Sequence, residues 1–282
     1  MSDKEKKISI HQFDQDGAKP IDDLVTVEEP LEIRVVSGSV ENRRGKSISI
    51  TMRTPGHDHE LAIGFLACEG IISTHDQVQS VQSIGTADNE FGHPNTVCVE
   101  LTPDTDINYS ELQRHFYSTS SCGVCGKASL EALEYRNLTA IQSELSIEAT
   151  TILKLPQRLR ENQTSFEQTG GIHAAGLFDK QGRIQRIRED VGRHNALDKL
   201  IGSNFLQKEF PMPEQIVVVS GRASFELLQK TLTAQIPIFV AVGAPSSLAV
   251  DLARQFDLTL IGFASNSRFN IYSSPQRVIW PK

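Results

Sequence analysis

Two cysteines in one glycine-flanked loop are the residues of this chain whose types and spacing most clearly suggest chemistry. In the stretch SCGVCGKASLEALE, Cys122 and Cys125 form a C-x-x-C pair just before a segment typical of a helix. The start of a helix favours the thiolate form of a cysteine, because its free N–H groups and positive dipole end stabilise negative charge. Lys127 adds a nearby cation. Such a pair fits three chemistries: a disulfide switch, half of a metal site, or a carrier of sulfane sulfur.

The remaining cysteines help to weigh these three alternatives. Zinc needs about four ligands, and the chain has no second C-x-x-C pair, so we expect no metal site. Cys68 and Cys98 lie inside a predicted helix and a predicted strand, where we expect them to pack as small apolar residues. A thioredoxin-like dithiol normally lies in a βαβ setting, whereas this pair lies in a predicted linker. Sulfur relay is favoured, and a dithiol oxidoreductase stays open as an alternative.

Small and polar residues follow three apolar strands of the last third of the chain. QIVVVSGRAS places Gly221 and Arg222 at the end of one strand, VGAPSS follows the next, and GFASNSRFN places Asn266 and Arg268 after the third. The carboxyl edge of such a sheet is where α/β proteins bind ligands. These strand ends therefore predict one crevice that holds phosphate or pyrophosphate groups through backbone amides and arginine.

Two further motifs carry histidines. TGGIHAAGLFD places His173 at the start of a strand, where a satisfied structural histidine is the more common role. REDVGRHNALDKLIG places Arg193 and His194 in the first turn of a helix that Asp190 is positioned to cap. That first turn is equally suited to solvent exposure and to binding an anion.

Composition and length indicate a globular chain of about two domains. Of its 282 residues, 39% are apolar and 22% are charged, a balance that supports a sizeable core. We expect a small α+β domain over residues 25–115, a linker carrying the cysteine loop over 116–145, and an α/β domain over 146–282. The first twenty or so residues are polar, and we expect them to be loosely held.

Hydrophobic periodicity predicts the elements of these domains. Two strands between Leu31 and Met52 precede a helix with an apolar stripe at Leu61, Phe65 and Cys68. Residues 150–170 are predicted to form one helix. In the last third, apolar strands alternate with amphipathic helices, which favours a parallel sheet covered on both faces.

The charge pattern and the termini exclude several classes of protein. The net charge of −7 argues against nonspecific binding to nucleic acid. The amino-terminal segment lacks the apolar core of a signal peptide, and no run approaches the roughly 18 apolar residues of a membrane span. Four cysteines in a chain of this length do not form a disulfide framework. We expect a soluble, cytoplasmic protein.

Taken together, six blocks resemble the FdhD family of formate dehydrogenase accessory sulfurtransferases. The blocks, in chain order, are SCGVCG, TGGIHAAGLFD, REDVGRHNALDKLIG, SGRASFELLQK, GAPSSLAVDLA and LIGFASNSRFNIYS. The resemblance implies a carrier that accepts sulfur from a cysteine desulfurase and passes it to the molybdenum cofactor of formate dehydrogenase. It also implies that Cys122 holds the persulfide, that Cys125 is its partner, and that the protein is a homodimer.

The same resemblance implies a cargo and a fold. The cargo is the bis-molybdopterin guanine dinucleotide form of the molybdenum cofactor. The residues that we assign to its binding are Phe263, Ala264, Ser265, Asn266, Ser267, Arg268, Gly221, Arg222 and His194. The expected fold is a cytidine deaminase-like three-layer α/β/α carboxy-terminal domain with a smaller amino-terminal α+β domain. Zinc deamination is disfavoured, because Ala175 stands where the deaminase His-x-Glu motif needs its glutamate. A cofactor chaperone that never holds sulfur covalently is the rival interpretation.

Overall fold

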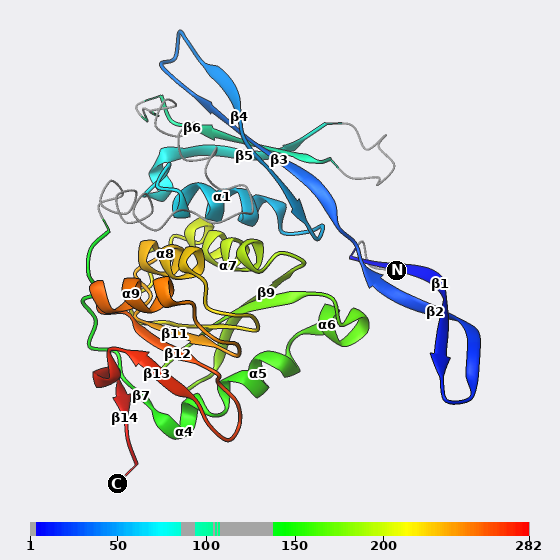
Figure 1. The fold of residues 1–282 in the computed structure, drawn as a ribbon. Coiled ribbons are helices and arrows are strands. Elements are labelled where there is room, and N and C mark those ends of the chain that lie inside the picture. The colour runs from blue at the N-terminus through cyan, green and yellow to red at the C-terminus, as the bar shows by residue number, and fades with distance from the viewer. Residues whose placement is uncertain (1–3, 86–93, 104, 106, 108–137, 282) are drawn as a thin grey trace.

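The computed structural model describes residues 4–85, 94–103, 105, 107 and 138–281. Its main parts are a six-stranded sheet flanked by helices, a four-stranded sheet, and a two-stranded arm that projects from the body (Figure 1). Two short strands, β7 (Ile147–Glu148) and β14 (Val278–Ile279), pair in parallel beside the larger sheet. The fold is mixed α/β, as the sequence predicts.

The six-stranded sheet forms the centre of the carboxy-terminal region. Its strands in spatial order are β13 (Asn270–Ser273), β12 (Thr259–Gly262), β11 (Ile238–Ala241), β10 (Ile216–Val219), β8 (His173–Phe178) and β9 (Ile184–Asp190). The strands β10, β11 and β12 are parallel, whereas β8, β9 and β13 pair antiparallel with their neighbours. The parallel sheet expected for the last third of the chain is confirmed for β10, β11 and β12, and antiparallel strands extend it on both sides. A tight turn such as the one at Gly182 between β8 and β9 can join only antiparallel strands.

Helices cover both faces of this sheet (Figure 1). One face packs against α7 (Arg193–Leu206), α8 (Phe225–Thr233) and α9 (Ser247–Gln255), in a core that includes Leu197, Leu227 and Leu252. The other face packs against α4 (Ala149–Ile152) and α5 (Leu155–Glu161), in a core that includes Ile152 and Leu159. Each strand of the centre is apolar throughout because both of its faces are covered. The region thus has three layers, α/β/α.

Residues 150–170 form three short helices instead of the single helix expected. They are α4, α5 and α6 (Thr164–Thr169). Pro156 lies in the first turn of α5, where its missing N–H costs nothing and its ring ends the preceding helix. The chain then turns again at Asn162 and Gln163. These breaks bring the start of α6 to the side of β9, where the Glu189 carboxylate accepts hydrogen bonds from the Ser165 and Phe166 amides.

The four-stranded sheet carries one helix on its inner face. Its order is β4 (Arg44–Arg53), β3 (Glu29–Ser37), β6 (Thr96–Leu101) and β5 (Val78–Ile84). Alternate residues of β3 are buried, as period-two patterning requires, and they meet α1 (Asp58–Cys68). A short 3-10 helix, η1 (His75–Gln77), follows α1, and a second, η2 (Pro275–Arg277), precedes β14. The expected single stripe of α1 is too narrow, because Ile63 and Leu66 are buried too.

The helices α1 and α7 join the two sheets by crossing at two glycines. A Cβ atom built on Gly202 would lie 1.9 Å from the carbonyl oxygen of Glu60, and one built on Gly64 would lie 1.8 Å from that of Asp198. The backbones of the two helices therefore touch, and only glycine fits at either position. This contact fixes α7, whose first residues belong to the predicted anion site.

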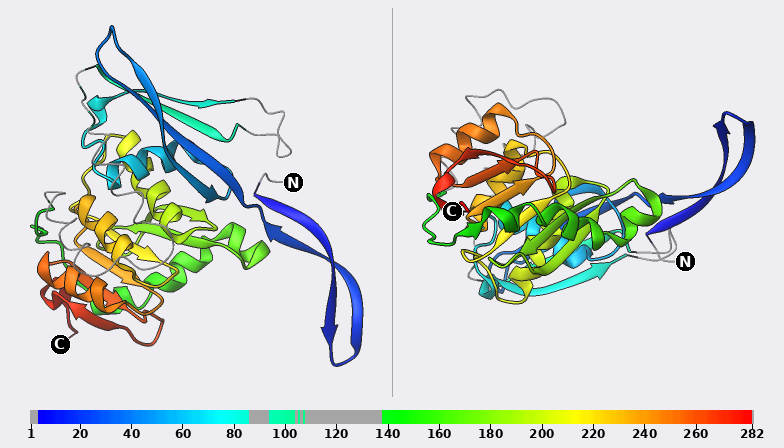
Figure 2. Two further views of the ribbon diagram at one scale, coloured as in Figure 1. Left: turned by 45° about the horizontal axis from the view of Figure 1, so that its top comes forward. Right: turned by 90° about the horizontal axis from the view of Figure 1, so that it is seen from below.

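The first strands, β1 (Glu5–Asp14) and β2 (Gly17–Thr26), form a regular antiparallel hairpin. The expectation that these residues are loosely held is wrong. Polarity misleads here because ten cross-strand pairs, not a buried core, hold the hairpin together. Figure 2 shows that it extends away from the rest of the molecule in two further views.

Candidate functional site

The three predicted strand ends meet at one edge of the six-stranded sheet. The amide of Gly243 donates to the carbonyl of Gly221 at 3.0 Å, and the amide of Phe263 donates to the carbonyl of Gly243 at 3.0 Å. A Cβ atom at Gly243 would lie 2.9 Å from Arg222 Cγ, so glycine lets the Arg222 side chain cross this strand end. The prediction that these segments lie side by side is confirmed.

A hollow of about 580 Å³ opens beside these strand ends, and we call it the strand-end hollow. Its lining includes Gln163, Phe166, Gly171, His173, Ser220 and Val242. Ser220 Oγ accepts a hydrogen bond from the Ala174 amide at 2.9 Å, so its own hydroxyl proton is left to donate. The hollow thus combines an apolar wall with several polar groups, as small-molecule sites do.

His173 and Arg193 approach each other at Gly221. A Cβ atom on Gly221 would lie 3.6 Å from His173 Nδ1 and 3.8 Å from Arg193 Cδ. Burial lowers the pKa of His173, and the positive charges of Arg193 and His194 lower it further. The imidazole is therefore neutral at pH 7, and Arg193 supplies the positive charge of this corner.

Two buried donors at this corner lack hydrogen-bond partners within the described part of the chain. They are Gln163 Nε2 and Arg193 Nε. Gln163 is only 4% exposed and lines the strand-end hollow. An unpaired buried donor costs roughly 1–3 kcal/mol, and a bound acceptor removes that cost. No sequence pattern indicates Gln163, because it lies in a turn outside every recognisable motif.

His194 pairs with a carboxylate instead of facing solvent alone. Its Nε2 lies 3.3 Å from Ser224 Oγ and 3.6 Å from Glu226 Oε2. The His194 ring beside Glu226 lowers the pKa of that carboxyl to about 2. The negative charge of Glu226 offsets part of the positive charge that the sequence predicts at the start of α7. His194 is thus positioned at the strand ends, but it already has a partner.

The predicted segment from Phe263 to Arg268 forms the turn between β12 and β13. Phe263 is exposed and Ala264 is buried, while Ser265 Oγ accepts from the Arg268 amide at 3.2 Å. Asn266 Nδ2 donates to Gln157 Oε1 of α5 at 3.1 Å. The turn is therefore anchored on α5.

Ser267 and Arg268 line a second hollow, of about 540 Å³, together with the exposed Trp280. Neither residue is among those that line the strand-end hollow. Of the predicted binding residues, only Ser267 and Arg268 line either hollow, and the strand-end hollow is lined by neighbours of the others, such as His173 and Ser220.

The structure describes two of the four cysteines, Cys68 and Cys98. Cys122 and Cys125 lie outside the described residues. Cys68 is 1% exposed, and burial raises the pKa of its thiol well above the usual value. Cys98 is partly buried on the outer face of β6, and burial raises its thiol pKa as well. Structural packing, as predicted, accounts for Cys68.

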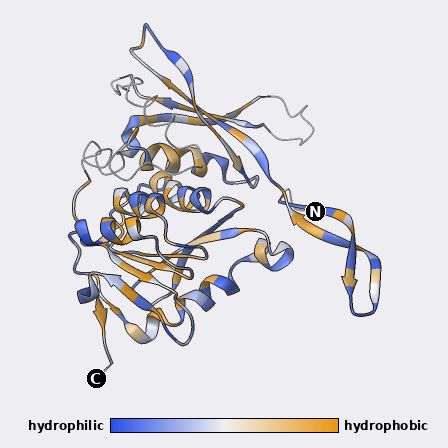
Figure 3. Cartoon of the chain, in the orientation of Figure 1, coloured by the Kyte–Doolittle hydropathy of each residue, from blue (hydrophilic) through white to orange (hydrophobic). Residues whose placement is uncertain are grey.

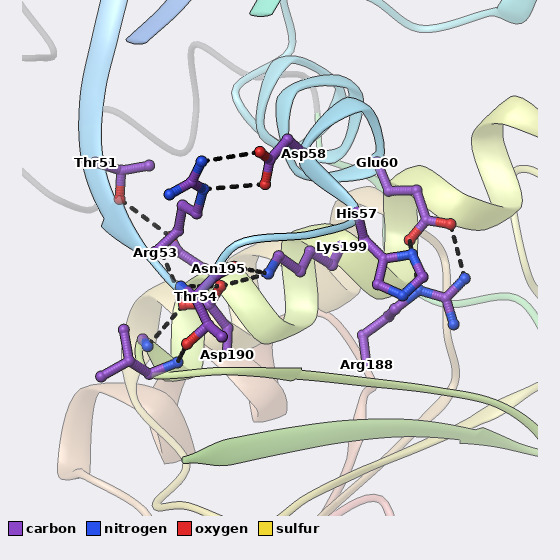
Figure 4. A network of polar contacts seen from close by, with 12 residues as sticks. Thr51, Arg53, Thr54, His57, Asp58, Glu60, Arg188, Asp190, Asn195 and Lys199 are labelled. Atoms are coloured by element: carbon purple, nitrogen blue, oxygen red, sulfur yellow. Dashed lines mark hydrogen bonds and ion pairs between the residues drawn. The ribbon is translucent and has the colours of Figure 1, made fainter. Parts of the chain in front are cut away.

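A buried polar network holds the beginning of α7 against the four-stranded sheet (Figure 4). Lys199 Nζ lies 2.6 Å from Asp190 Oδ2 and donates to the carbonyl oxygen of Thr54 at 2.8 Å. Asp190 also accepts from the amides of Thr54 and Gly192, the second of which lies just before α7. Asn195 donates to the carbonyl of Met52 at 2.7 Å. The prediction that Asp190 caps α7 is wrong, because the N-cap is Gly192 and no side chain caps it; Asp190 instead ties the residue before the helix to β4.

A second ion-pair cluster in the same contact joins α1 to β9. Arg188 pairs with both carboxylate oxygens of Glu60, and His57 Nδ1 lies 3.3 Å from the same carboxylate. Burial opposes ionisation of Glu60, but Arg188 and His57 outweigh it and lower its pKa to about 2. Arg53 is fully buried and bonds Glu29 and Asp58 at 3.0 Å each. These charges are paired within the protein and are not free to bind a ligand.

Comparison with known proteins shows first a solved structure with the same fold and then the family to which the chain belongs. A crystal structure from Desulfotalea psychrophila, described as "a putative formate dehydrogenase accessory protein", has the same fold. The TM-score is 0.74 at 22% sequence identity, covering 98% of this chain and all of that one. Residues 26–279 match the sequence model of the FdhD/NarQ family. The chain therefore belongs to the FdhD/NarQ family.

Curated relatives carry a consistent name. A protein of Streptomyces coelicolor named sulfur carrier protein FdhD is 45% identical over 259 residues, which is 91% of this chain and 89% of that protein. A protein of the same name from Sulfurisphaera tokodaii is 40% identical over 274 residues, covering 97% and 99% of the two chains.

Within the described residues, no helix is long and apolar enough to cross a membrane.

Proposed function

We propose that this protein is a sulfur carrier that serves the maturation of formate dehydrogenase. It accepts sulfane sulfur from a cysteine desulfurase as a persulfide on Cys122 and transfers that sulfur to the molybdenum cofactor. Membership of the FdhD/NarQ family and the shared name of its relatives support this proposal. The C-x-x-C sequence supports the choice of Cys122 and Cys125.

The observation that carries the cargo part of the proposal is the corner formed by Gln163, His173 and Arg193. A guanine dinucleotide brings phosphate oxygens and base acceptors, and this corner offers a guanidinium and an unpaired amide donor. Gly243 lets the Arg222 side chain cross the adjacent strand end, so a second guanidinium lies close to this corner. We propose that one nucleotide end of the bis-molybdopterin guanine dinucleotide binds here, beside Arg222 and His194.

The sulfur chemistry needs no oxidant in its loading step. The Cys122 thiolate attacks the terminal sulfur of the donor's persulfide, the donor's S–S bond breaks, and the donor cysteine leaves as a thiolate. For release, Cys125 either relays the sulfur or attacks Cys122 Sγ. The second route forms a Cys122–Cys125 disulfide, expels hydrosulfide to the metal, and requires a cellular dithiol to reduce the disulfide afterwards.

Intact-protein mass spectrometry tests the loading step. The chain is incubated with a cysteine desulfurase and cysteine, and a reductant-sensitive gain of one sulfur, about 32 Da, is expected. The gain should disappear in Cys122→Ala. Cys125→Ala is the matched control and should still be loaded. Absence of any gain while the desulfurase is active would reject the proposal.

The rival, a chaperone that only cradles the cofactor, makes the opposite prediction in cells. It requires Arg222→Ala to abolish formate dehydrogenase maturation while both cysteine variants mature the enzyme normally. The proposal requires Cys122→Ala to fail. A dithiol oxidoreductase instead requires a reversible Cys122–Cys125 disulfide in the absence of any sulfur donor, which thiol counts before and after mild oxidation detect.

Two further expectations, about the relationship of the fold and about the cellular location, belong to the same proposal. We propose that the three-layer region is a cytidine deaminase-like scaffold without deaminase chemistry, since Ala175 is fully buried in β8. The relationship would be contradicted if the central sheet of cytidine deaminases had a strand order different from that of the six-stranded sheet described above. We also propose that the protein acts in the cytoplasm, which fractionation of cells would test.

A further inference from the structure

The strand-end hollow is largely apolar inside, whereas the cations of this region lie mainly at its border. Leu159 and Ile172 contribute buried apolar wall, and Arg160 is the one charged side chain among the described residues that line the hollow. The Arg160 guanidinium is exposed and lies 3.7 Å from the centre of the Phe166 ring. Figure 3 shows the central strands that end beside the hollow as mostly hydrophobic segments. A group bound inside the hollow therefore meets little charge.

Gln163 contributes to this hollow an amide donor that the fold itself does not use. Its backbone completes the turn between α5 and α6: the Gln163 amide donates to the Arg160 carbonyl at 3.2 Å, and the Gln163 carbonyl accepts from the Glu167 amide at 3.1 Å. The side chain is 4% exposed, and its Nε2 atom has no hydrogen-bond partner in the described part of the chain. Such a buried donor destabilises the protein until an acceptor reaches it.

The usual structural task of this position is performed by another residue. Gln163 is the N-cap of α6, and an N-cap side chain normally accepts a hydrogen bond from one of the first free amides of its helix. Here the Glu189 carboxylate of β9 accepts from the amides of Ser165 and Phe166. The Gln163 side chain makes no capping bond. Its amide group is therefore available to a ligand.

An uncharged donor in an apolar hollow suits an uncharged acceptor. Burying a phosphate away from cations is costly, whereas Arg193 and Arg222 at the neighbouring strand ends can pair with it. Ser220 also lines the hollow, and its hydroxyl proton is left to donate because Oγ already accepts from the Ala174 amide. The Gln163 and Ser220 side chains thus favour a carbonyl oxygen over an amino group.

We propose that Gln163 is a specificity-determining residue of the cargo site, which donates from Nε2 to the carbonyl oxygen of the guanine base inside the strand-end hollow. The ribose leads out of the hollow, and the phosphates meet Arg193 and Arg222 at the strand ends. Adenine and cytosine carry an amino group where guanine carries that carbonyl, so they present a donor to a donor. The inference rests on the proposed function, because it assigns one part of the same cargo to each part of the same site.

The size of the selectivity follows from the chemistry of the side chain. The amide of Gln163 can rotate by half a turn and present its oxygen to an amino group, which reduces the discrimination that one hydrogen bond provides. The Ser220 hydroxyl opposes that rotation by offering a second donor to a carbonyl. We therefore expect a selectivity of about tenfold for guanine over adenine. The pterin ring of the same cargo has the same amino–oxo edge as guanine, so both rings have to be tested.

Calorimetry with the full chain compares guanosine diphosphate (GDP), adenosine diphosphate (ADP) and inorganic pyrophosphate. The wild-type chain should bind GDP about tenfold more tightly than ADP. Gln163→Met, which keeps the length of the side chain and removes its donor, should weaken GDP binding about tenfold and leave ADP and pyrophosphate binding unchanged. Gln163→Glu, which offers only acceptors when ionised, should reverse the preference between GDP and ADP. Gln142→Met, at an exposed position elsewhere, is the matched control and should change none of these affinities.

A second set of ligands tests the orientation of the nucleotide. Arg222→Gln should weaken the binding of GDP and of pyrophosphate and leave the ratio of GDP to ADP affinity as it is in the wild type. Guanosine, which has no phosphate, should lose affinity in Gln163→Met and keep it in Arg222→Gln. Guanosine should also bind the wild-type chain more tightly than neopterin does. The reverse order would assign the hollow to the pterin ring and overturn the choice of guanine.

The outcomes separate this inference from the proposed function. A ratio of GDP to ADP affinity that Gln163→Met does not change would overturn the inference and leave the proposed cargo site intact. An equal loss of pyrophosphate binding in that variant would also overturn it, because the substitution would then disturb the whole site. A wild-type chain that binds neither nucleotide would overturn the cargo site and the inference together, whereas sulfur loading on Cys122 is decided by mass spectrometry alone.

Discussion

Replacing Gly202 by alanine should separate α1 from α7, and the structure lets the size of the effect be worked out. The new Cβ atom would lie 1.9 Å from the Glu60 carbonyl oxygen and 2.6 Å from the Gly64 amide nitrogen. Real Cβ atoms keep at least 3.0 Å from such neighbours, so the two backbones must part by about 1 Å. Neither contacting atom belongs to a flexible side chain that could move aside.

Two opposing terms decide the sign of this substitution. Alanine in place of glycine inside a helix stabilises the protein by about 1 kcal/mol when it meets no obstacle. Overpacking of a close contact costs roughly 1–3 kcal/mol, and a backbone collision belongs at or above the top of that range. We therefore expect a net loss of about 2 kcal/mol or more, which lowers the melting temperature by about 4–8 °C in a chain of this size.

Urea unfolding followed by circular dichroism measures the change in the free energy of unfolding. Gly45→Ala is the matched control, because its Cβ would meet nothing closer than Val36 Cγ2 at 3.6 Å. Gly64→Ala should resemble Gly202→Ala, and the double variant should cost less than the sum of the two, since the first substitution already parts the helices. A Gly202→Ala protein as stable as wild type, or more so, would refute the reasoning.

Two further predictions concern charges close to the candidate site. The pKa of Glu60 is about 2 in the folded protein against 4.5 for the free group. Because the folded-state value is the lower one, ionised Glu60 contributes about 2–3 kcal/mol of stability above pH 4.5, and this is lost as the pH falls towards 2. Glu60→Gln should therefore be destabilised at pH 7 and approach wild type in acid unfolding; a gap that is constant with pH would contradict this. Glu226→Gln should bind guanosine diphosphate up to about fivefold more tightly by calorimetry, since His194 is released from its carboxylate partner; weaker binding would show that Glu226 itself contacts the cargo.

Hydrophobic periodicity and the residue types at the strand ends were sufficient to predict the central strands of the carboxy-terminal region and the side-by-side position of their ends. The strands β10, β11 and β12 are continuous apolar runs because both faces of the sheet are covered, and their ends carry glycine and polar residues because the chain must turn there. Those two signals are local in sequence. They predict that Gly221, Gly243 and Phe263 lie side by side, and they do.

The features that sequence reasoning missed depend on contacts between distant segments. Gln163 matters because the turn before α6 buries it beside β8, and nothing in its neighbours indicates that burial. The arm was missed because cross-strand pairing, and not a buried core, holds its two strands together. The partnership of His194 with Glu226 joins the starts of α7 and α8, two helices separated by a strand. Period and composition carry no information about such pairs.

The strand β4 connects the four-stranded sheet to the proposed cargo site. Thr51 Oγ1 donates to Asn195 Oδ1, and the Met52 carbonyl accepts from Asn195 Nδ2, so two consecutive residues of β4 hold the first turn of α7 (Figure 4). That turn begins with Arg193, the cation of the strand-end corner. These contacts order the turn that carries Arg193, so Asn195→Ala is expected to loosen it and to weaken the binding of guanosine diphosphate, which calorimetry would measure.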